Sequence, residues 1–145
     1  MSAMSDYLEN KIIDQLFRGQ AYAFPSTLYI GLLTAVPSDT GGGTEVSGGG
    51  YARASSAAGL ATFAGTQGVG TTAASTGNTG TTSNNASITF VTPTASWGAV
   101  TSFGIYDTAT GGNLLFYGTL SISKTINQGD TVTFPAASLS VQIDN

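Results

Sequence analysis

The stretch AVTSFGIYD, residues 99–107, alternates like a β-strand and carries apolar side chains on both of its faces. Val100 and Tyr106 fall on one face, and Phe103 and Ile105 fall on the other. The following stretch NLLFYGTL, residues 113–120, has apolar groups on both faces as well. We therefore expect two neighbouring strands in a sheet that is covered on one side by a partner sheet and on the other by a helix or another subunit.

Further strand patterns flank this pair, and turn residues separate them. The turn signals are rich in Gly, Asn and Asp, which tolerate positive φ angles. Several short strands with turns at short intervals predict a mainly β fold, an antiparallel sandwich or barrel, within a single domain of residues 1–145. The β part spans 26–145, and its other strand patterns are TLYIGLLT (27–34), YARASSA (51–57), ASITFVT (86–92), TVTFP (131–135) and SLSVQID (138–144).

One amphipathic helix is predicted over residues 5–18. Leu8, Ile12 and Leu16 recur at four-residue spacing, so they share one face, and Ser5 is a suitable N-cap. Asp14 and Arg18 are spaced for an ion pair, and Gly19 suits the left-handed position after the helix. We expect the apolar face to cover a sheet of the same subunit, with contact to a neighbouring subunit as the alternative.

Composition excludes several classes of function. Only 8% of residues are charged and the net charge is −4, so a basic surface for nucleic acid is absent. The chain has no cysteine, and no run of residues is apolar and long enough to span a membrane. A signal peptide is not apparent, so we expect synthesis and assembly in the cytoplasm. Such a charge-poor surface favours a protein that packs against others.

The stretch GTQGVGTTAASTGNTGTTSNNA, residues 65–86, has no charge and no aromatic residue. Its Thr and Asn residues disfavour a helix, so we expect a long polar loop or arm that becomes ordered on a neighbour. A mobile loop without such a role and an edge strand are the alternatives. The candidate interface residues of this stretch are Thr71, Thr72, Asn78, Thr81, Thr82 and Asn84, and those elsewhere are Leu8, Ile12, Leu16 and Trp97.

Residues that could support catalysis or bind a cofactor are few. Histidine and cysteine are both absent, and we expect Lys124 to be solvated, so we expect no enzyme activity. The glycine-rich stretch at 41–50 lacks the lysine of a phosphate-binding loop, and no set of acids has the spacing of a calcium site, so no cofactor or metal is expected. Trp97 is expected to anchor the core, with stacking on a sugar as the alternative. The acids in or beside predicted turns, where they would cap backbone amides, are Asp39, Glu45, Asp107, Asp130 and Asp144.

Seven segments together resemble a family of small virion proteins of tailed bacteriophages. They are SDYLENKIIDQLFRGQ (5–20), TLYIGLLTAVPSD (27–39), GGGYARA (48–54), TTAASTGNTGTTSNNASITF (71–90), ASWGAVTSFGIYD (95–107), GGNLLFYGTL (111–120) and TINQGDTVTFPAASLSV (125–141). Members of that family are often labelled tail fibre proteins, and others look like cement or decoration proteins of capsids with a jelly-roll β-sandwich. The resemblance brings no catalytic residues with it.

The resemblance leaves cement and fibre open, and the sequence favours cement. A fibre needs repeated β-structure or a coiled coil, and the chain has neither heptads nor a repeat. We expect a jelly-roll-like capsid cement protein on the outer capsid surface, whose partners are the major capsid protein and itself, as a dimer or trimer. A tail fibre subunit or host-glycan-binding adhesin is the alternative.

Overall fold

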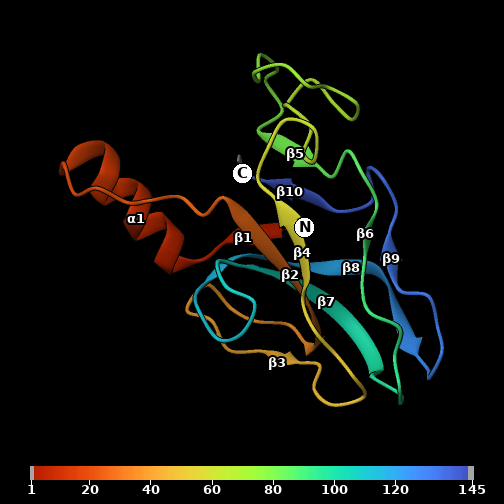
Figure 1. The fold of residues 1–145 in the computed structure, drawn as a ribbon. Helices are drawn as coiled ribbons and strands as arrows, with labels where there is room; N and C mark the ends of the chain where they lie inside the picture. Colours follow the sequence, from red (N-terminus) through yellow and green to blue (C-terminus); the bar gives the residue numbers. More distant parts are fainter. Residues whose placement is uncertain (1, 144–145) are drawn as a thin grey trace.

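The computed structural model describes residues 2–143, which form mainly antiparallel β-structure with one helix near the N-terminus (Figure 1). At the centre of the main sheet, β7 (Gly98–Tyr106) lies between β8 (Leu114–Ile126) and β2 (Thr27–Ala35). Val100 is 1% exposed and Phe103 is 5% exposed, although they point to opposite faces of β7. The prediction that this strand is covered on both faces is confirmed.

Two glycines allow large side chains to lie across the central strands. Gly104 of β7 pairs with Tyr117 of β8, and Phe103 pairs with Gly118. A Cβ atom at Gly104 would lie 2.8 Å from the Tyr106 ring, and one at Gly118 would lie 2.9 Å from the Phe103 ring. The absence of a side chain at these two positions therefore makes room for the aromatic rings that cover them.

Short strands complete the main sheet at both edges. β1 (Ser2–Met4) pairs with residues 116–118 of β8 at one edge. At the other edge, β4 (Ala54–Ala57) pairs with the first half of β2 and β3 (Thr44–Glu45) with the second half. The sequence did not predict β1 or β3, and β8 continues to Ile126, beyond the end predicted at Leu120.

Two separate two-stranded sheets supply the remaining strands, and residues from them join the core. β5 (Thr81–Ser83) pairs with β10 (Ser140–Gln142), and β6 (Ile88–Thr89) pairs with β9 (Thr133–Phe134). Ile88, Phe90 and Val141 from these segments share one buried cluster with Val100 and Phe103 of β7. The antiparallel, mainly β fold class is thus confirmed, whereas the jelly-roll form of the sandwich stays a prediction.

The single helix of the described residues, α1, runs from Asp6 to Phe17. The Ser5 hydroxyl accepts a hydrogen bond from the Leu8 amide at 3.3 Å, as expected of an N-cap. Arg18 is the C-cap and lies 3.4 Å from Asp14, and Gly19 follows with a φ of +67°. The predicted bounds at 5 and 18 are therefore the two caps of the helix.

Candidate interaction surface

The apolar face of α1 covers the sheet of its own subunit only at its N-terminal end. Leu8 is 5% exposed and Ile12 is partly buried, but Leu16 is 70% exposed. Ile13 and Phe17 beside it are also exposed. Figure 1 shows why: α1 projects away from the strands, so its C-terminal half has no sheet beneath it. The expectation that this face is covered within one subunit is wrong for that half.

An apolar cavity of about 300 Å³ lies between α1 and the body of the protein. Leu8 and Ile12 line it from the helix, and Leu28 and Phe116 line it from the main sheet. Phe24, in the segment that returns from α1 to β2, also lines it and is 60% exposed. This cavity and the exposed half of α1 therefore form one continuous region of apolar surface.

Aromatic contacts hold the returning segment against the helix. The ring of Tyr22 lies 6.3 Å from that of Tyr7 and 4.9 Å from that of Phe24, both edge to face. The Gln15 side chain accepts a hydrogen bond from the Tyr22 amide at 2.6 Å. These contacts give the projecting helix a defined position although it lies mostly outside the core.

The polar stretch 65–86 is folded onto itself and onto the two small sheets, β5 with β10 and β6 with β9, which form the second layer of the fold. Asn85 donates to the carbonyls of Leu60 and Thr71, and its own side-chain oxygen accepts from the Gly70 amide. Gln67 donates to the Ala74 carbonyl at 2.7 Å. Since residues 81–83 form β5, this part of the stretch is a strand, one of the alternatives that the sequence left open.

The six candidate residues of this stretch therefore differ in their availability to a partner. Thr72 and Asn78 have exposed side chains, whereas Thr71, Thr81 and Thr82 are partly buried and their hydroxyls donate to backbone carbonyls of the same chain. Asn84 is 0% exposed. The prediction that Asn84 is an interface residue is wrong, because its side chain is enclosed by its own subunit.

The side-chain amide of Asn84 joins two segments, its own at residues 84–86 and the one that connects β9 to β10. Its side-chain nitrogen donates to the carbonyls of Ala86 and Pro135 at 2.8 Å each, and its side-chain oxygen accepts from the Leu139 amide at 2.9 Å. The bond from Leu139 gives a buried backbone amide its partner. Asn84 thus fixes the stretch before β10.

Trp97 is a core residue and does not form an interface. It is 4% exposed, and its indole nitrogen donates to the Gly49 carbonyl at 3.0 Å. The centres of the Trp97 and Tyr51 rings lie 5.2 Å apart in an edge-to-face contact. The expectation that it anchors the core is confirmed. Its place among the interface candidates, and the alternative of a sugar stacked on its face, are wrong because the ring is covered.

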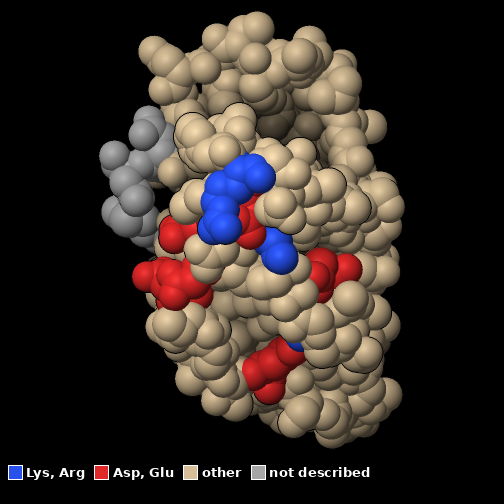
Figure 2. Space-filling model, turned by 90° about the vertical axis from the view of Figure 1, so that its left-hand side faces the viewer, with Lys and Arg blue, Asp and Glu red and all other residues tan. Residues whose placement is uncertain are grey.

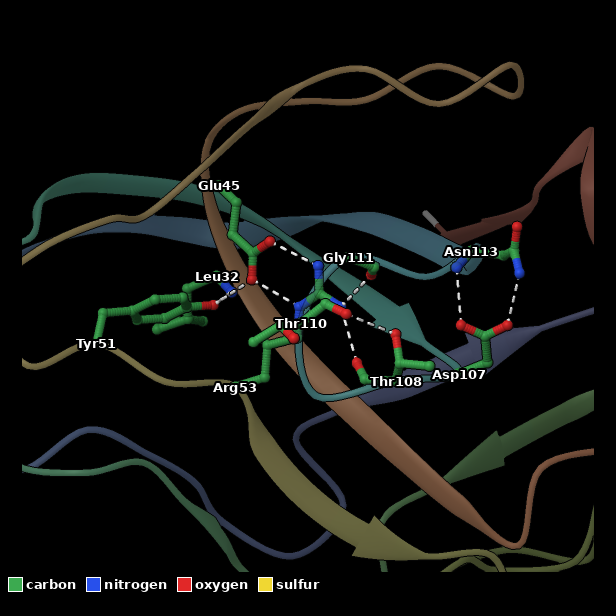
Figure 3. Close-up of polar contacts among 9 residues, drawn as sticks. All are labelled: Leu32, Glu45, Tyr51, Arg53, Asp107, Thr108, Thr110, Gly111 and Asn113. Carbon is green, nitrogen blue, oxygen red and sulfur yellow. Dashed lines mark hydrogen bonds and ion pairs between the residues drawn. The ribbon is translucent and has the colours of Figure 1, made fainter.

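Beside β2, a network of polar contacts surrounds Arg53 (Figure 3). Arg53 forms two hydrogen bonds with the Glu45 carboxylate, at 2.7 and 2.8 Å, and donates to the carbonyls of Thr108 and Gly111. The Tyr51 hydroxyl donates to Glu45 at 2.8 Å and accepts from the Leu32 amide. Burial, and to a lesser degree the Glu45 carboxylate, raises the pKa of Tyr51.

This network is better suited to hold strands together than to bind or transform a substrate. Both carboxylate oxygens of Glu45 are paired with Arg53, and the Arg53 side chain is only 6% exposed. The network joins β3, the start of β4 and the loop after β7. Sequence analysis named Glu45 only as an acid near a turn that would cap a backbone amide, and it did not pair Glu45 with Arg53.

Asp107 and Asp130 cap backbone amides near turns, as the sequence predicted, whereas Asp39 bonds to a side chain instead. Asp107 accepts from the amide and the side chain of Asn113, and Asp130 accepts from the Asn127 amide, each at 2.7 Å. Asp39 accepts from the Tyr117 hydroxyl. Asp144 lies outside the described residues. Within residues 2–143, no group of three or more acids is placed to hold a metal ion.

Charges are sparse on the face that carries α1. Figure 2 shows a few acidic and basic groups in the middle and lower part of this face, with uncharged surface above them. Lys124 is exposed on β8, as expected. Of the described chain, α1 is the only helix, and it is neither long nor apolar enough to cross a membrane.

These features define a small antiparallel β-protein with a charge-poor surface and a projecting apolar helix, a form that favours contact with other chains. A sequence model of the family described as podophage GP4 fiber I protein gp80 matches residues 3–142. The chain belongs to this family, and the resemblance to small virion proteins of tailed phages is confirmed. No curated protein matches the chain at a significant level.

Proposed function

We propose that this chain is a non-enzymatic structural subunit of a tail fibre of a tailed phage. The observation that carries the proposal is the family match over residues 3–142, because that family is described by a podophage fibre protein. The match spans both layers of the fold and α1, so it is not limited to one short motif. We therefore propose a fibre subunit ahead of capsid cement, which the sequence alone favoured.

The shape of the chain indicates how it would take part in such a structure. The described residues form a compact unit with one short helix, without the extended repeat that would build a long fibre within one chain. We therefore propose that it acts through contacts with other chains, including further copies of itself in a dimer or trimer. The net charge of −4 argues against nucleic acid as a partner, and the proposal includes no membrane partner.

Capsid cement is the second candidate function, and the compact, charge-poor domain favours it. A protein of this kind would bind the major capsid protein on the outer capsid surface and stabilise the shell by binding the assembled lattice. Small neutral polar groups such as Thr72 and Asn78 lose little free energy of hydration when a partner covers them, compared with charged groups.

Labelling purified virions with a gold-conjugated antibody against this protein separates the two functions. For a fibre subunit we expect the label at the tail. Label spread over the head would support cement instead. Purified virions that carry no label at either place, although the antibody detects the protein in infected cells, would contradict a virion role altogether.

A further inference from the structure

The C-terminal half of α1 extends past the sheet with its apolar face uncovered. Leu16 is on the same face as Leu8 and Ile12, which line the cavity beneath the helix, but it is 70% exposed. Phe17 beside it is 77% exposed. The apolar pattern of the helix is therefore longer than the surface that its own subunit provides for it.

Three of the charged groups of α1 and its C-cap point away from Leu16, whereas Glu9, seven residues before Leu16, lies on the same side of the helix and is exposed. At 100° per residue, Lys11, Asp14 and Arg18 fall on the side of the helix opposite Leu16. Arg18 pairs with Asp14 at 3.4 Å, and the Lys11 ammonium lies 5.5 Å from the Tyr7 ring. Covering the apolar face would therefore not require these three charges to lose their water.

Exposed apolar residues at the cavity and at the end of α1 together make a patch of useful size. Phe24 and Ile143 line the cavity and are 60 and 62% exposed, and Ile13, Leu16 and Phe17 near the end of α1 are 48, 70 and 77% exposed. Taking roughly 200 Å² for a fully exposed large apolar side chain, the patch offers on the order of 600 Å². If two copies each bury this patch, the total buried area reaches the lower limit of about 1,000 Å² for a specific protein interface.

We propose that a second copy of this chain covers the patch, with the end of α1 from one copy, Leu16 and Phe17, packed into the apolar cavity of the other. The projecting end and the cavity lie next to each other on one molecule, so two copies related by rotation make the contact twice. The two surfaces match in chemistry, because both are apolar.

This inference deepens the proposed function by naming the surface through which copies associate. It rests on that function only for its place in the virion, since self-association is measured on the purified protein. Failure of virion labelling would leave the self-association result standing. A protein that stays monomeric would overturn this inference without contradicting a virion role.

Sedimentation velocity of the purified chain tests the proposal. We expect a species larger than the 14.6 kDa monomer at tens of micromolar protein. The double variant L16S/F17S should raise the dissociation constant at least about tenfold, because large apolar side chains leave the contact. Its far-UV circular dichroism spectrum should match that of the natural chain, since both residues are exposed in the single subunit.

Ile122→Ser is the matched control, because Ile122 is 67% exposed but lies on β8 away from the patch. We expect this variant to associate like the natural chain. A monomeric natural chain, or equal weakening by the control and the double variant, would overturn the proposal. A monomeric natural chain would mean that the patch binds a different virion protein rather than a second copy.

Cysteine cross-linking gives a second measurement, since the chain has no cysteine of its own. Leu16→Cys mixed with Ala58→Cys, a residue that lines the cavity, should form disulfide-linked pairs of unlike chains on mild oxidation. Ile122→Cys mixed with Ala58→Cys should not. Equal cross-linking in both mixtures would show that the contact is not specific to the end of α1.

Discussion

The guanidinium carbon of Arg53 lies 3.4 Å from the centre of the Tyr106 ring, so the arginine stacks on the aromatic face. The same group pairs with Glu45. We expect Arg53→Ala to lower the free energy of unfolding by about 3 kcal/mol, because removing one member of a buried pair leaves its partner uncompensated. Urea denaturation followed by Trp97 fluorescence measures this change.

Arg18→Ala is the matched control for that variant. Arg18 also pairs with an acid, Asp14, but its side chain is 69% exposed. Exposed pairs of this kind stabilise a protein by about 0–1 kcal/mol, so the control should stay in that range. Equal losses in the two variants would show that the network around Arg53 does not hold the strands together.

Alkaline pH should destabilise the fold through its tyrosines. Burial raises the pKa of Tyr51 above its usual 10.0, and the hydrogen bond to Asp39 raises the pKa of Tyr117 to about 12. A raised pKa in the folded state means that the stabilisation is complete below pH 10 and is lost as the pH rises through the folded-state pKa. Urea denaturation at a series of pH values from 10 upward should show falling stability.

Tyr51→Phe separates the contribution of this buried hydroxyl. At neutral pH we expect a loss of about 1–3 kcal/mol, because the Leu32 amide loses its acceptor. Above pH 10 the variant should lose less further stability than the natural chain, since no phenol remains there to ionise. If the stability of the variant fell with pH as steeply as that of the natural chain, Tyr51 would not control the alkaline transition.

Asn84→Ala should destabilise the second layer. The substitution leaves the buried Leu139 amide without its acceptor, which costs about 1–3 kcal/mol, whereas the Pro135 carbonyl keeps its hydrogen bonds from Ser138. Asn78→Ala is the control from the same stretch, because Asn78 is exposed, and it should change stability by less than about 0.5 kcal/mol. Thermal unfolding of both variants decides whether the buried amide matters.

Hydrogen exchange should divide the polar stretch in two. The amides of residues 72–78 should exchange quickly, because these residues are exposed and lie in a surface loop. Amides of β5 should be protected by pairing with β10. Uniformly fast exchange from 65 to 86 would contradict the pairing of β5, and uniform protection would show that the loop is packed more tightly than described.

The centre of the fold could be predicted because its signals are local. β2, β7 and α1 each have enough residues for a period of two or of 3.6 to stand out. β1 and β5 have three residues each, too few for any period, and only their partners define them. Short strands of this kind depend on tertiary pairing rather than on their own sequence.

The candidate surface could be predicted only in part, for a related reason. The spacing of Leu8, Ile12 and Leu16 identifies an apolar face, but it does not say where the sheet beneath that face ends. Likewise, Arg53 reaches carbonyls 55 and 58 positions along the chain. Contacts that are this distant in sequence follow from the register of the strands, which composition and periodicity do not determine.

β1 and the cap of α1 are held by a part of the chain that is made much later. The Ser5 hydroxyl donates to the Leu114 carbonyl, 109 positions along, and Ser2 accepts from the Gln142 amide. On the ribosome, β1 therefore emerges long before β8 exists to receive it. Until then, the apolar face of α1 has no sheet at all beneath it. Residues of β1 and α1 thus wait for neighbours that lie more than 100 positions later in the chain.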